Sequence, residues 1–543
     1  MADREIKRMS FVSRKVLKDI LGDLPYAAEV YWRLRQPGKP VTAKFTLSQL
    51  QKTLPVWRNQ AEASPYLLQP GKQVLIFGTL RYWLEHTTLV GMALAGQGHT
   101  VTLAYLPYGT WQKPMNYFDL RRQNVYTQEV LKLTGPLLKI VPFLNQKPEP
   151  LPEGLDRAIQ QLALRDTQYT LQVEEVTIDS ELYRFRLERN RQAAWAALEW
   201  IKGNQPDVVV VPNGTILEFG ALYQAAAYTQ TPVVTYEFGE QRERIWLARN
   251  AEVMRQDTDS LWDRRHLQAL TNEQMDQARN LFAARQRASL WENFARRWQD
   301  TPSEGGERVR LALKLDHRPV LLLATNVIGD SLTLGRQVFS DSMTEWIEKT
   351  VQYLAKRPDI QFIIRIHPGE LVTKGPSVAD VVLRALGLSV ERMAEIPEYI
   401  HLIPADAKVN TYDLVEVADL GLVYTTTVGM EMVMSGVPVI VVGNTHYRTK
   451  GFTLDPDTWE AYFDLLKKAL ANPIEVRPTR QQVEQAWNYA YRFFFEYPHP
   501  FPWHVVHFWK DEAIWPLKRV LSQEGQEVFG NTFRYLVGEP VEW

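Results

Sequence analysis

Short runs of β-branched and other apolar residues alternate with longer helical stretches in this chain, and the alternation occurs twice. Such a pattern is typical of parallel sheets that are covered by helices. We expect strands in two blocks, at residues 74–77, 101–103, 208–211 and 233–234, and then at 320–323, 362–364, 420–423 and 439–442. The simplest architecture is an α/β fold with two Rossmann-like, doubly wound domains that face one another across a cleft.

Helix-rich segments surround and interrupt the two blocks. The expected parts of the chain are a mostly helical N-terminal segment at 1–70, an N-terminal Rossmann-like domain at 71–300 with a helical insertion at about 117–204, a C-terminal Rossmann-like domain at 301–475, and an aromatic-rich helical segment at 476–543. The aromatic segment either packs its rings on another domain or presents them to a membrane interface or a partner.

The 62 Lys and Arg residues nearly balance the 63 Asp and Glu residues, which gives a formal charge of −1. Binding to phosphate backbones needs a positive excess, so we expect no nucleic-acid partner. The chain has no cysteine, which excludes disulfides and thiolate metal sites. We find neither a membrane-spanning run of ~18 to 20 apolar residues nor a signal peptide. We therefore expect a cytoplasmic protein, free or at the inner face of the cell membrane, with a basic amphipathic helix in residues 1–20 that lies on that membrane or packs on its own domain.

Ligands of open parallel sheets bind beyond the carboxyl ends of the strands, so the residues after each apolar run are candidates for a site. In the first block these include Gly78, which allows a close backbone turn, and Asn213, whose amide is available to a ligand. His86 follows on the next helix and is a candidate acid or base. Thr215 and Glu218 have the spacing of a helix capping box, which predicts a structural role for Glu218.

Two acidic residues follow the last strand of the first block. Glu237 and Glu240 lie on either side of the flexible residue Gly239. A carboxylate at this end of a sheet can serve as a general base, and on spacing alone it is equally well a solvated loop residue. We predict that Glu237 is the base, with Glu240 and His86 as the alternates.

Basic side chains follow a strand of the second block. Strand alternation places Arg365 and His367 on the same face at the end of the run 362–364, and Glu370 follows them. A later loop carries His446, Arg448 and Lys450 beyond the last strand. Such side chains either form a solvated surface or bind an anionic ligand.

A hydroxyl-rich turn follows the run 420–423. Its residues Thr425, Thr426 and Thr427 precede Gly429 and a predicted helix, and exposed amides and hydroxyls at such a turn suit a phosphate group. Glu431 is four residues after Thr427, one position too far for a capping box. Its carboxylate can therefore accept hydrogen bonds from a ribose diol or compensate the helix dipole.

Two familiar signals are missing from the sequence. Neither a complete Gly-x-Gly-x-x-Gly motif nor a Walker loop occurs, which argues against hydride transfer and nucleotide hydrolysis. Asp257 and Asp259 match a two-aspartate pattern of metal-dependent sugar transferases, but they lie in a polar helical stretch and do not follow a strand. We expect no cofactor and no metal site.

Five motifs occur together, within about 70–110, 207–245 and 320–465: Arg365-Ile366-His367-Pro368, Tyr424-Thr425-Thr426-Thr427 with Gly429 and Glu431, Gly436-Val437-Pro438-Val439, Tyr447 with Gly451-Phe452-Thr453-Leu454-Asp455, and Asn213-Gly214 with Glu237-Phe238-Gly239. In combination they resemble the capsule polysaccharide biosynthesis family. That family contains GT-B-fold transferases, including enzymes that transfer Kdo from CMP-Kdo.

The resemblance implies roles for several of these residues. His367 and the turn Thr425–Thr427 would contact the phosphate of the donor nucleotide, Glu431 would hold its sugar, and a first-domain acid would activate the acceptor. The Kdo-transferring members show two adjacent acids where this chain has Glu237 followed by Phe238. The donor sugar and the identity of the base therefore stay open.

We accordingly expect a metal-independent GT-B-like glycosyltransferase. It would move a sugar from a nucleotide-sugar donor, for which CMP-Kdo is one candidate, to a growing surface polysaccharide or glycolipid. The donor would bind the second domain and the acceptor the first. Two alternatives are a sugar-nucleotide epimerase or hydrolase on the same scaffold and a non-catalytic polysaccharide-assembly protein.

Overall fold

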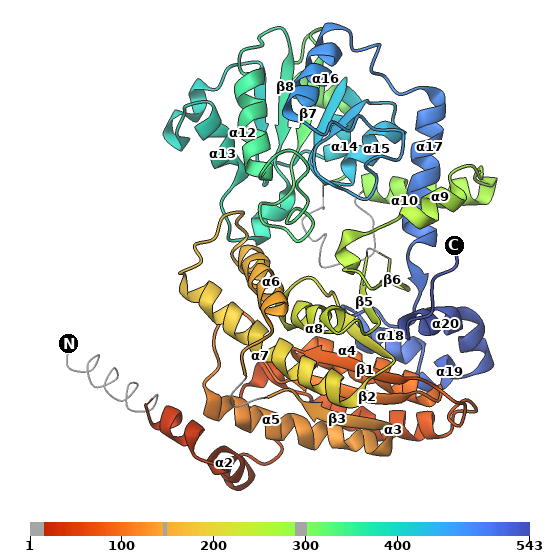
Figure 1. Cartoon of the computed structure of the whole chain (residues 1–543). Coiled ribbons are helices and arrows are strands. Elements are labelled where there is room, and N and C mark those ends of the chain that lie inside the picture. Colours follow the sequence, from red (N-terminus) through yellow and green to blue (C-terminus); the bar gives the residue numbers. More distant parts are fainter. Residues whose placement is uncertain (1–15, 145–148, 240, 288–300) are drawn as a thin grey trace. The chain divides into compact units, whose positions relative to one another are not determined.

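The computed structural model describes residues 16–144, 149–239, 241–287 and 301–543 (Figure 1). The chain divides into two compact units. Unit 1 consists of Met1–Asp166, Ile178–Val253 and His499–Glu542, and unit 2 consists of Thr167–Thr177, Met254–Pro498 and Trp543. The boundary at Pro498 divides the aromatic-rich C-terminal segment between the two units.

The sheet of unit 1 has the strand order β12-β6-β5-β4-β1-β2-β3. Its strands are β1 (Gln73–Thr79), β2 (Thr100–Leu106), β3 (Leu138–Pro142), β4 (Val208–Pro212), β5 (Val233–Glu237), β6 (Arg244–Arg249) and β12 (His499–Pro500). The first five run parallel to one another, whereas β6 and β12 are antiparallel additions at one edge. The chain extends from β1 in one direction to β2 and β3, and later in the other direction to β4 and β5. This reversal between β1 and β4 is the switch point of a doubly wound sheet.

The helices of unit 1 cover both faces of this sheet. Figure 1 shows α7 (Glu181–Asn204) and α8 (Leu217–Tyr228) on one side and α3 (Ser48–Glu62) and α5 (Tyr117–Leu131) on the other. The helix α4 (Arg81–Gly96) is buried from Trp83 to its end, since it packs against β1, β2 and α3.

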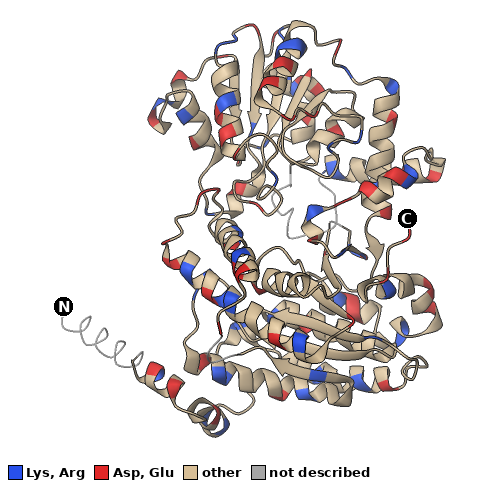
Figure 2. Ribbon diagram, in the orientation of Figure 1, with Lys and Arg blue, Asp and Glu red and all other residues tan. Residues whose placement is uncertain are grey.

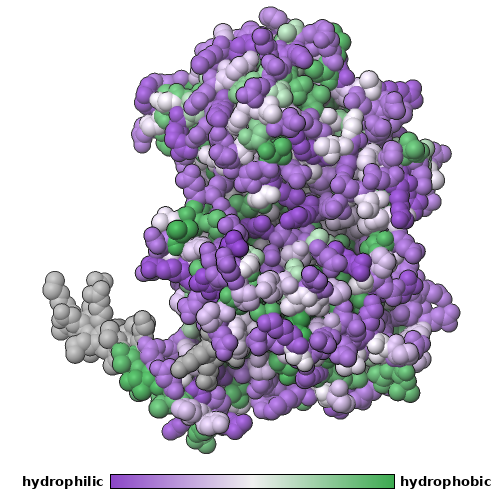
Figure 3. All heavy atoms as spheres, viewed as in Figure 1, coloured by the Kyte–Doolittle hydropathy of each residue, from purple (hydrophilic) through white to green (hydrophobic). Residues whose placement is uncertain are grey.

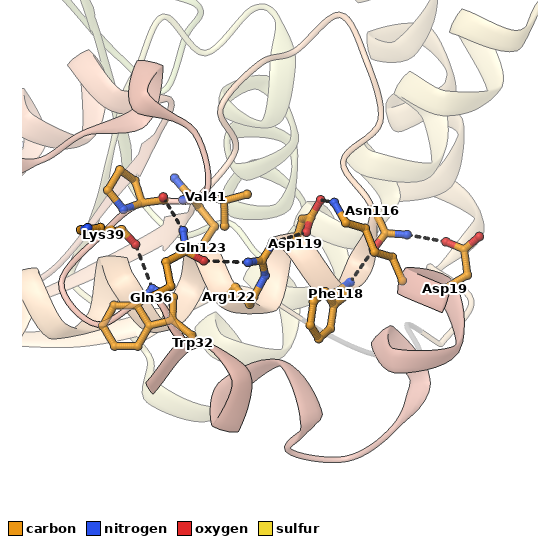
Figure 4. A network of polar contacts seen from close by, with 12 residues as sticks. Asp19, Trp32, Gln36, Lys39, Val41, Asn116, Phe118, Asp119, Arg122 and Gln123 are labelled. Carbon is orange, nitrogen blue, oxygen red and sulfur yellow. Dashed lines mark hydrogen bonds and ion pairs between the residues drawn. The ribbon is translucent and has the colours of Figure 1, made fainter. Parts of the chain in front are cut away.

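The N-terminal helix α2 (Ala27–Arg35) packs on α5 through a polar network, which Figure 4 shows in close view. Arg122 Nη1 donates to Gln36 Oε1 at 2.7 Å, and Gln123 Oε1 accepts from the backbone of Val41 at 2.8 Å. Eight large apolar side chains of residues 16–34 are exposed: Val16, Leu17, Ile20, Leu24, Tyr26, Val30, Tyr31 and Leu34. Figure 3 shows hydrophobic residues at the surface of this N-terminal region.

Unit 2 contains a parallel sheet with the order β11-β10-β7-β8-β9. Its strands are β7 (Val320–Ala324), β8 (Gln361–Arg365), β9 (Ile400–Ile403), β10 (Leu420–Val423) and β11 (Val439–Val441). Here the switch point lies between β7 and β10. The core combines the buried strands with the apolar faces of α12 (Met343–Leu354), α13 (Val378–Ala385) and α16 (Trp459–Ala471). The structure thus confirms the α/β class, the two doubly wound sheets and every predicted strand.

Most aromatic residues of the C-terminal segment pack inside their own unit. Tyr489, Phe493 and Tyr497 are buried in unit 2, where α17 (Arg480–Tyr491) continues into a π-helical turn at Arg492–Glu496. Phe501 and Trp503 are buried in unit 1. Basic and acidic residues are interspersed on the helices of both units (Figure 2). Within the part of the chain that is described, no helix is both long and apolar enough to cross a membrane.

Candidate functional site

Three neighbouring strands of unit 2 end in polar side chains that contact one another. The backbone N–H of His367, after β8, donates to Thr325 Oγ1, after β7, at 3.0 Å. Asn326 Oδ1 accepts from the backbone N–H of Thr425, after β10, at 3.2 Å. Because β7 and β10 flank the switch point, this row lies where doubly wound sheets bind ligands. We call residues 325–326, 367 and 425–427 the strand-end row.

Thr425 and His367 are two residues of the strand-end row whose side chains carry hydrogen-bond donors. The Oγ1 atom of Thr425 is buried and has no hydrogen-bond partner among the described residues. His367 Nδ1 accepts from the backbone N–H of Gly369 at 2.9 Å, which assigns the ring proton to Nε2. Sequence reasoning missed Thr325 and Asn326, although they directly follow the end of β7 at Ala324.

The turn after β10 is fixed by a tyrosine. The hydroxyl of Tyr447 donates to the backbone oxygen of Thr426 at 2.6 Å. A Cβ atom at Gly429 would lie 2.4 Å from that hydroxyl, so the packing requires glycine. Thr427 precedes α15 (Val428–Met434) without making a side-chain capping bond. The turn is therefore held by its neighbours, and its threonine hydroxyls are not consumed by helix capping.

Glu431 forms a buried ion pair that the sequence did not predict. Its Oε1 atom accepts from Arg285 Nη2 at 2.5 Å, and both side chains are almost inaccessible to solvent. Arg285 lies on α10 (Asn272–Gln286) and also donates to the hydroxyl of Tyr412 at 3.2 Å. The Oε2 atom of Glu431 is buried without a hydrogen-bond partner among the described residues. One oxygen of Glu431 is thus engaged, and the other remains an acceptor.

Arg365 and Glu370 have structural partners, which corrects their assignment to a ligand site. The guanidinium of Arg365 is buried and donates to the carbonyls of Pro404 and Val409 at 2.6 and 3.2 Å. Burial lowers the pKa of Arg365 to about 10. Glu370 accepts from the Ser377 hydroxyl and the backbone N–H of Val378 at the start of α13. Both groups therefore hold loops in place, and His367 alone of the three belongs to the strand-end row.

The three basic residues after β11 are also turned inward. His446 stacks on Phe493 with ring centroids 3.7 Å apart, and its burial lowers its pKa well below the usual value. Arg448 is buried and donates to the carbonyls of Val441 and Pro456. Lys450 is buried in an ion pair with Asp259. The interpretation of this loop as a cluster of ligand-binding cations is corrected accordingly.

In unit 1, Glu237 ends β5 beside the loop that follows β4. Asn213 Nδ2 donates to Glu237 Oε2 at 2.9 Å, and the backbone N–H of Phe238 donates to Glu237 Oε1 at 3.0 Å. Asn213 and Gly214 both have positive φ angles, 57° and 75°, and a Cβ atom at Gly214 would meet Thr235 at 2.4 Å. Burial raises the pKa of Glu237. A carboxyl group with a raised pKa is a stronger base once it is ionised, which suits proton abstraction.

His86 belongs to the core, which corrects its assignment as an alternate base. Its side chain is 0% exposed, Nε2 donates to the carbonyl of Trp503 at 3.0 Å, and Nδ1 accepts from the Tyr236 hydroxyl at 3.3 Å. Burial lowers the pKa of His86 to about 3, so the ring stays neutral. Gly78 is similarly structural, because a Cβ atom there would lie 2.4 Å from Thr87 Oγ1. Glu240, the other alternate base, lies outside the described residues.

Glu218 is not part of a capping box. The helix α8 starts at Leu217 after Ile216, which makes no side-chain capping bond. Glu218 instead pairs with Arg186 Nη2 at 3.1 Å and Arg189 Nε at 2.8 Å, in a fully buried group. Glu218 therefore has a structural role, as predicted, but its partners lie on α7. Arg186 precedes Glu218 by 32 residues in the sequence.

A pocket of about 210 Å³ lies beside α4 in unit 1, next to the loop 505–510. Glu85 is a buried member of its lining, 3.9 Å from Arg81 Nη1. Burial raises the pKa of Glu85 from its usual 4.5 to about 7, while Arg81 and a hydrogen bond from Trp509 act in the opposite direction. Sequence reasoning missed Glu85, because the residues 505–510 that surround it lie far from it in the sequence.

The raised pKa of Glu85 predicts a pH-dependent cost to stability. Between pH 4.5 and 7 the folded protein binds the proton more tightly than the unfolded chain, so stability falls as pH rises and stays low above pH 7. We expect Glu85→Gln to stabilise the protein by up to about 3 kcal/mol at pH 8 and by about 1 kcal/mol or less at pH 5. Urea unfolding of both proteins at the two pH values measures this. An equal effect at both pH values would contradict it.

Among the described residues, no three His, Asp or Glu side chains are grouped as ligands for a metal ion.

No protein-family model matches the chain, and no curated protein matches it. Among solved structures, it is similar to the beta Kdo 2,4 transferase of KpsC from Thermosulfurimonas dismutans, with 17% identity, 55% of this chain and 82% of that chain covered, and a TM-score of 0.33. It is also similar to a UDP-GlcNAc 2-epimerase from Neisseria meningitidis, with 14% identity, 78% and 99% coverage, and a TM-score of 0.25.

A further similar structure is the glycotransferase of kitacinnamycin, with 14% identity, coverage of 78% of this chain and 95% of that chain, and a TM-score of 0.23. Scores of this size carry no argument about chemistry, so the function has to be argued from the residues. The chain itself is an α/β protein with two doubly wound sheets, and polar side chains contact one another at strand ends in each unit.

Proposed function

We propose that the protein is a glycosyltransferase that takes a sugar from a nucleotide-sugar donor and transfers it to a surface polysaccharide or glycolipid. The observation that carries this proposal is the strand-end row of unit 2, where residues after β8, β7 and β10 contact one another at the switch point. A nucleotide is the ligand class that such a crevice favours. The base at Glu237 in unit 1 supplies the second requirement of sugar transfer.

In this proposal the strand-end row binds the donor phosphates. The Nε2–H of His367 and the hydroxyls of Thr425 and Thr427 donate to the phosphate oxygens, and the remaining oxygen of Glu431 accepts from a ribose hydroxyl. As the bond to the anomeric carbon breaks, negative charge grows on the leaving phosphate. Donors fixed before the reaction stabilise that charge without reorganisation.

Glu237 acts on the acceptor in unit 1. Its ionised carboxylate takes the proton of the acceptor hydroxyl while the hydroxyl oxygen attacks the anomeric carbon and the nucleotide leaves. The two hydrogen bonds from Asn213 and Phe238 hold the carboxylate in place. General-base assistance of this kind is typically worth ~10² to 10⁴ in rate.

We expect a nucleotide to bind in the absence of divalent metal. Thermal-shift assays with CMP, UDP, GDP and ADP identify the best ligand, because binding to the native state stabilises it by about 2.7 kcal/mol at 100 times Kd. The shift should persist in chelator and shrink in Thr425→Val, which removes the buried hydroxyl at nearly constant volume. Binding that vanishes in chelator and returns with magnesium would contradict the prediction.

A sugar-nucleotide epimerase or hydrolase is the second candidate, because a carboxyl group with a raised pKa, such as Glu237, can return a proton as well as take one. The two activities differ in their need for an acceptor. An epimerase or hydrolase changes the nucleotide-sugar when it is alone with the protein. A transferase consumes it only with an acceptor present.

The location of the reaction is also part of the proposal. A polysaccharide or glycolipid acceptor is made at the inner face of the cell membrane in this scheme, and the protein would touch that membrane peripherally. The exposed apolar side chains of residues 16–34 support such a contact. Co-flotation with anionic vesicles, lost on replacing exposed Leu34 with Glu, would test it.

A further inference from the structure

The pocket beside α4 combines rings with charged groups in a way the proposed chemistry does not yet use. Its walls come from the first half of α4 and from residues 505–510, which comprise a turn and the start of α18 (Phe508–Ile514), both within unit 1. Its lining includes Arg81, Tyr82, Glu85, His507, Trp509 and Lys510.

The loop that forms one wall is held in place by its own contacts. Asp511 accepts from the backbone N–H of His504 at 2.9 Å and from Arg242 Nε at 2.6 Å. The backbone N–H of Val506 donates to His504 Nδ1 at 3.1 Å. A ligand therefore meets a wall that is already formed, which lowers the entropic cost of binding.

The ring of Trp509 is likewise positioned before any ligand binds. It stacks on Trp57 with centroids 5.7 Å apart and an angle of 17° between the planes. Trp57 Nε1 in turn donates to Glu512 Oε1 at 2.9 Å. Trp509 and Glu85 both line the pocket. The indole of Trp509 thus connects the pocket to the helix α3.

The charges of the pocket favour an anion. Arg81 and Lys510 supply two cations, and both side chains remain accessible at the rim. Glu85 is the one acidic residue of the lining, and its carboxyl group is buried against Arg81 and Trp509. Tyr82 and Trp509 add aromatic surface, on which the apolar face of a sugar ring packs well. A small anion alone would leave this aromatic surface unused.

We propose that this pocket binds an anionic sugar unit, one that carries a carboxylate or a phosphate. The inference rests on the proposed function in one respect, namely that the sugar belongs to the acceptor. The ring of Tyr82 lies 6.0 Å from that of Trp83, and Trp83 stacks at 6.2 Å on Phe238, the residue that follows Glu237. An acceptor held here would present a hydroxyl group near the carboxylate of Glu237.

Isothermal titration with two anionic probes and one neutral probe tests the proposal. The anionic probes are trigalacturonate, which carries carboxylates, and glucose 1-phosphate, and the neutral probe is maltotriose. We expect at least one anionic probe to bind more tightly than maltotriose, and added salt to weaken that binding. Binding of the carboxylate or of the phosphate probe identifies the source of the anion. Binding of neither, or equal binding of maltotriose, overturns the proposal.

Two variants locate the binding in the pocket. Lys510→Glu should weaken the anionic probe about tenfold or more, because a lost charge-assisted contact is replaced by repulsion. Lys518→Glu, an equally exposed change on the same C-terminal segment, should leave it unchanged. Tyr82→Ala should weaken binding and Tyr82→Phe should retain most of it. Equal effects of the two lysine changes, or none in any variant, would overturn the assignment.

A nucleotide titration of each variant separates this inference from the proposed function. Lys510 and Tyr82 lie in unit 1, whereas the strand-end row lies in unit 2. Nucleotide affinity should therefore stay at the wild-type value in every pocket variant. Anionic sugar binding in a protein that binds no nucleotide would uphold the pocket and reject the transferase.

Discussion

Replacing Glu237 with Gln is expected to lower the turnover of sugar transfer by ~10² to 10⁴ while nucleotide affinity stays the same. Glutamine keeps the size of the side chain and an oxygen that can accept from Asn213, but it cannot take a proton. The loss therefore belongs to the chemical step. Steady-state kinetics with the nucleotide-sugar identified by screening would measure it as a fall in kcat with little change in KM for the donor.

The pH profile supplies an independent readout for Glu237. The base acts in its ionised form, so turnover should fall as pH drops through the raised pKa of this carboxyl group. The acidic limb of the profile should be lost in Glu237→Gln, which has no group to titrate there. Glu240→Gln is the matched control. If that variant abolished turnover and Glu237→Gln retained it, the base would be Glu240.

The strands could be predicted from the sequence where they are buried on both faces. Val208–Pro212 and Val320–Ala324 are continuous apolar runs, and the structure places them at the centre of their sheets. Four strands at or next to sheet edges, β3, β6, β9 and β12, were missed, whereas the edge strand β11 was predicted. Arg244–Arg249 mixes polar with apolar residues, His499–Pro500 is two residues long, and Leu138–Pro142 lies in a segment that was expected to be helical. At a sheet edge, pairing with a neighbour decides the conformation more than the local pattern does.

The positions of His367, Thr425 and Glu237 at strand ends could be predicted from the sequence, but the partners of such residues could not. Whether a basic side chain faces a ligand or a nearby carbonyl depends on loops far away in sequence. Arg365 donates to Val409, 44 residues later, and no spacing rule predicts such a contact.

The same limit applies to buried ion pairs. Glu218 and Glu431 both come shortly after the end of a strand. The capping-box rule predicted a structural role for Glu218 but not for Glu431, because Glu431 lies one position too far from Thr427. In the structure both are buried beside arginines, Arg186 with Arg189 for Glu218 and Arg285 for Glu431. Burying a carboxylate requires a partner with the opposite charge, so a buried acid in a sequence predicts that a cation exists but does not say where.

Replacing Arg285 with Met should destabilise the protein by about 3 to 5 kcal/mol, because the Glu431 carboxylate would stay buried without its cation. The double variant Arg285→Met with Glu431→Gln should recover most of that loss, since it removes the uncompensated charge as well. Urea unfolding of the wild type, both single variants and the double variant measures the coupling. Additive effects of the two changes would contradict a coupled pair.

Two alanine variants decide whether Glu431 also holds the nucleotide. Losing a hydrogen bond to a charged group costs ~1.5 to 3 kcal/mol, so Glu431→Ala and His367→Ala should each weaken the affinity for the best nucleotide about 10- to 150-fold. The deoxyribonucleotide distinguishes their roles. If Glu431 accepts from the ribose, its loss should abolish the preference for the ribonucleotide, whereas His367→Ala should weaken both ligands equally, because their phosphates are the same. Unchanged affinity in both variants would remove the donor from the strand-end row and leave Glu431 as the buried partner of Arg285.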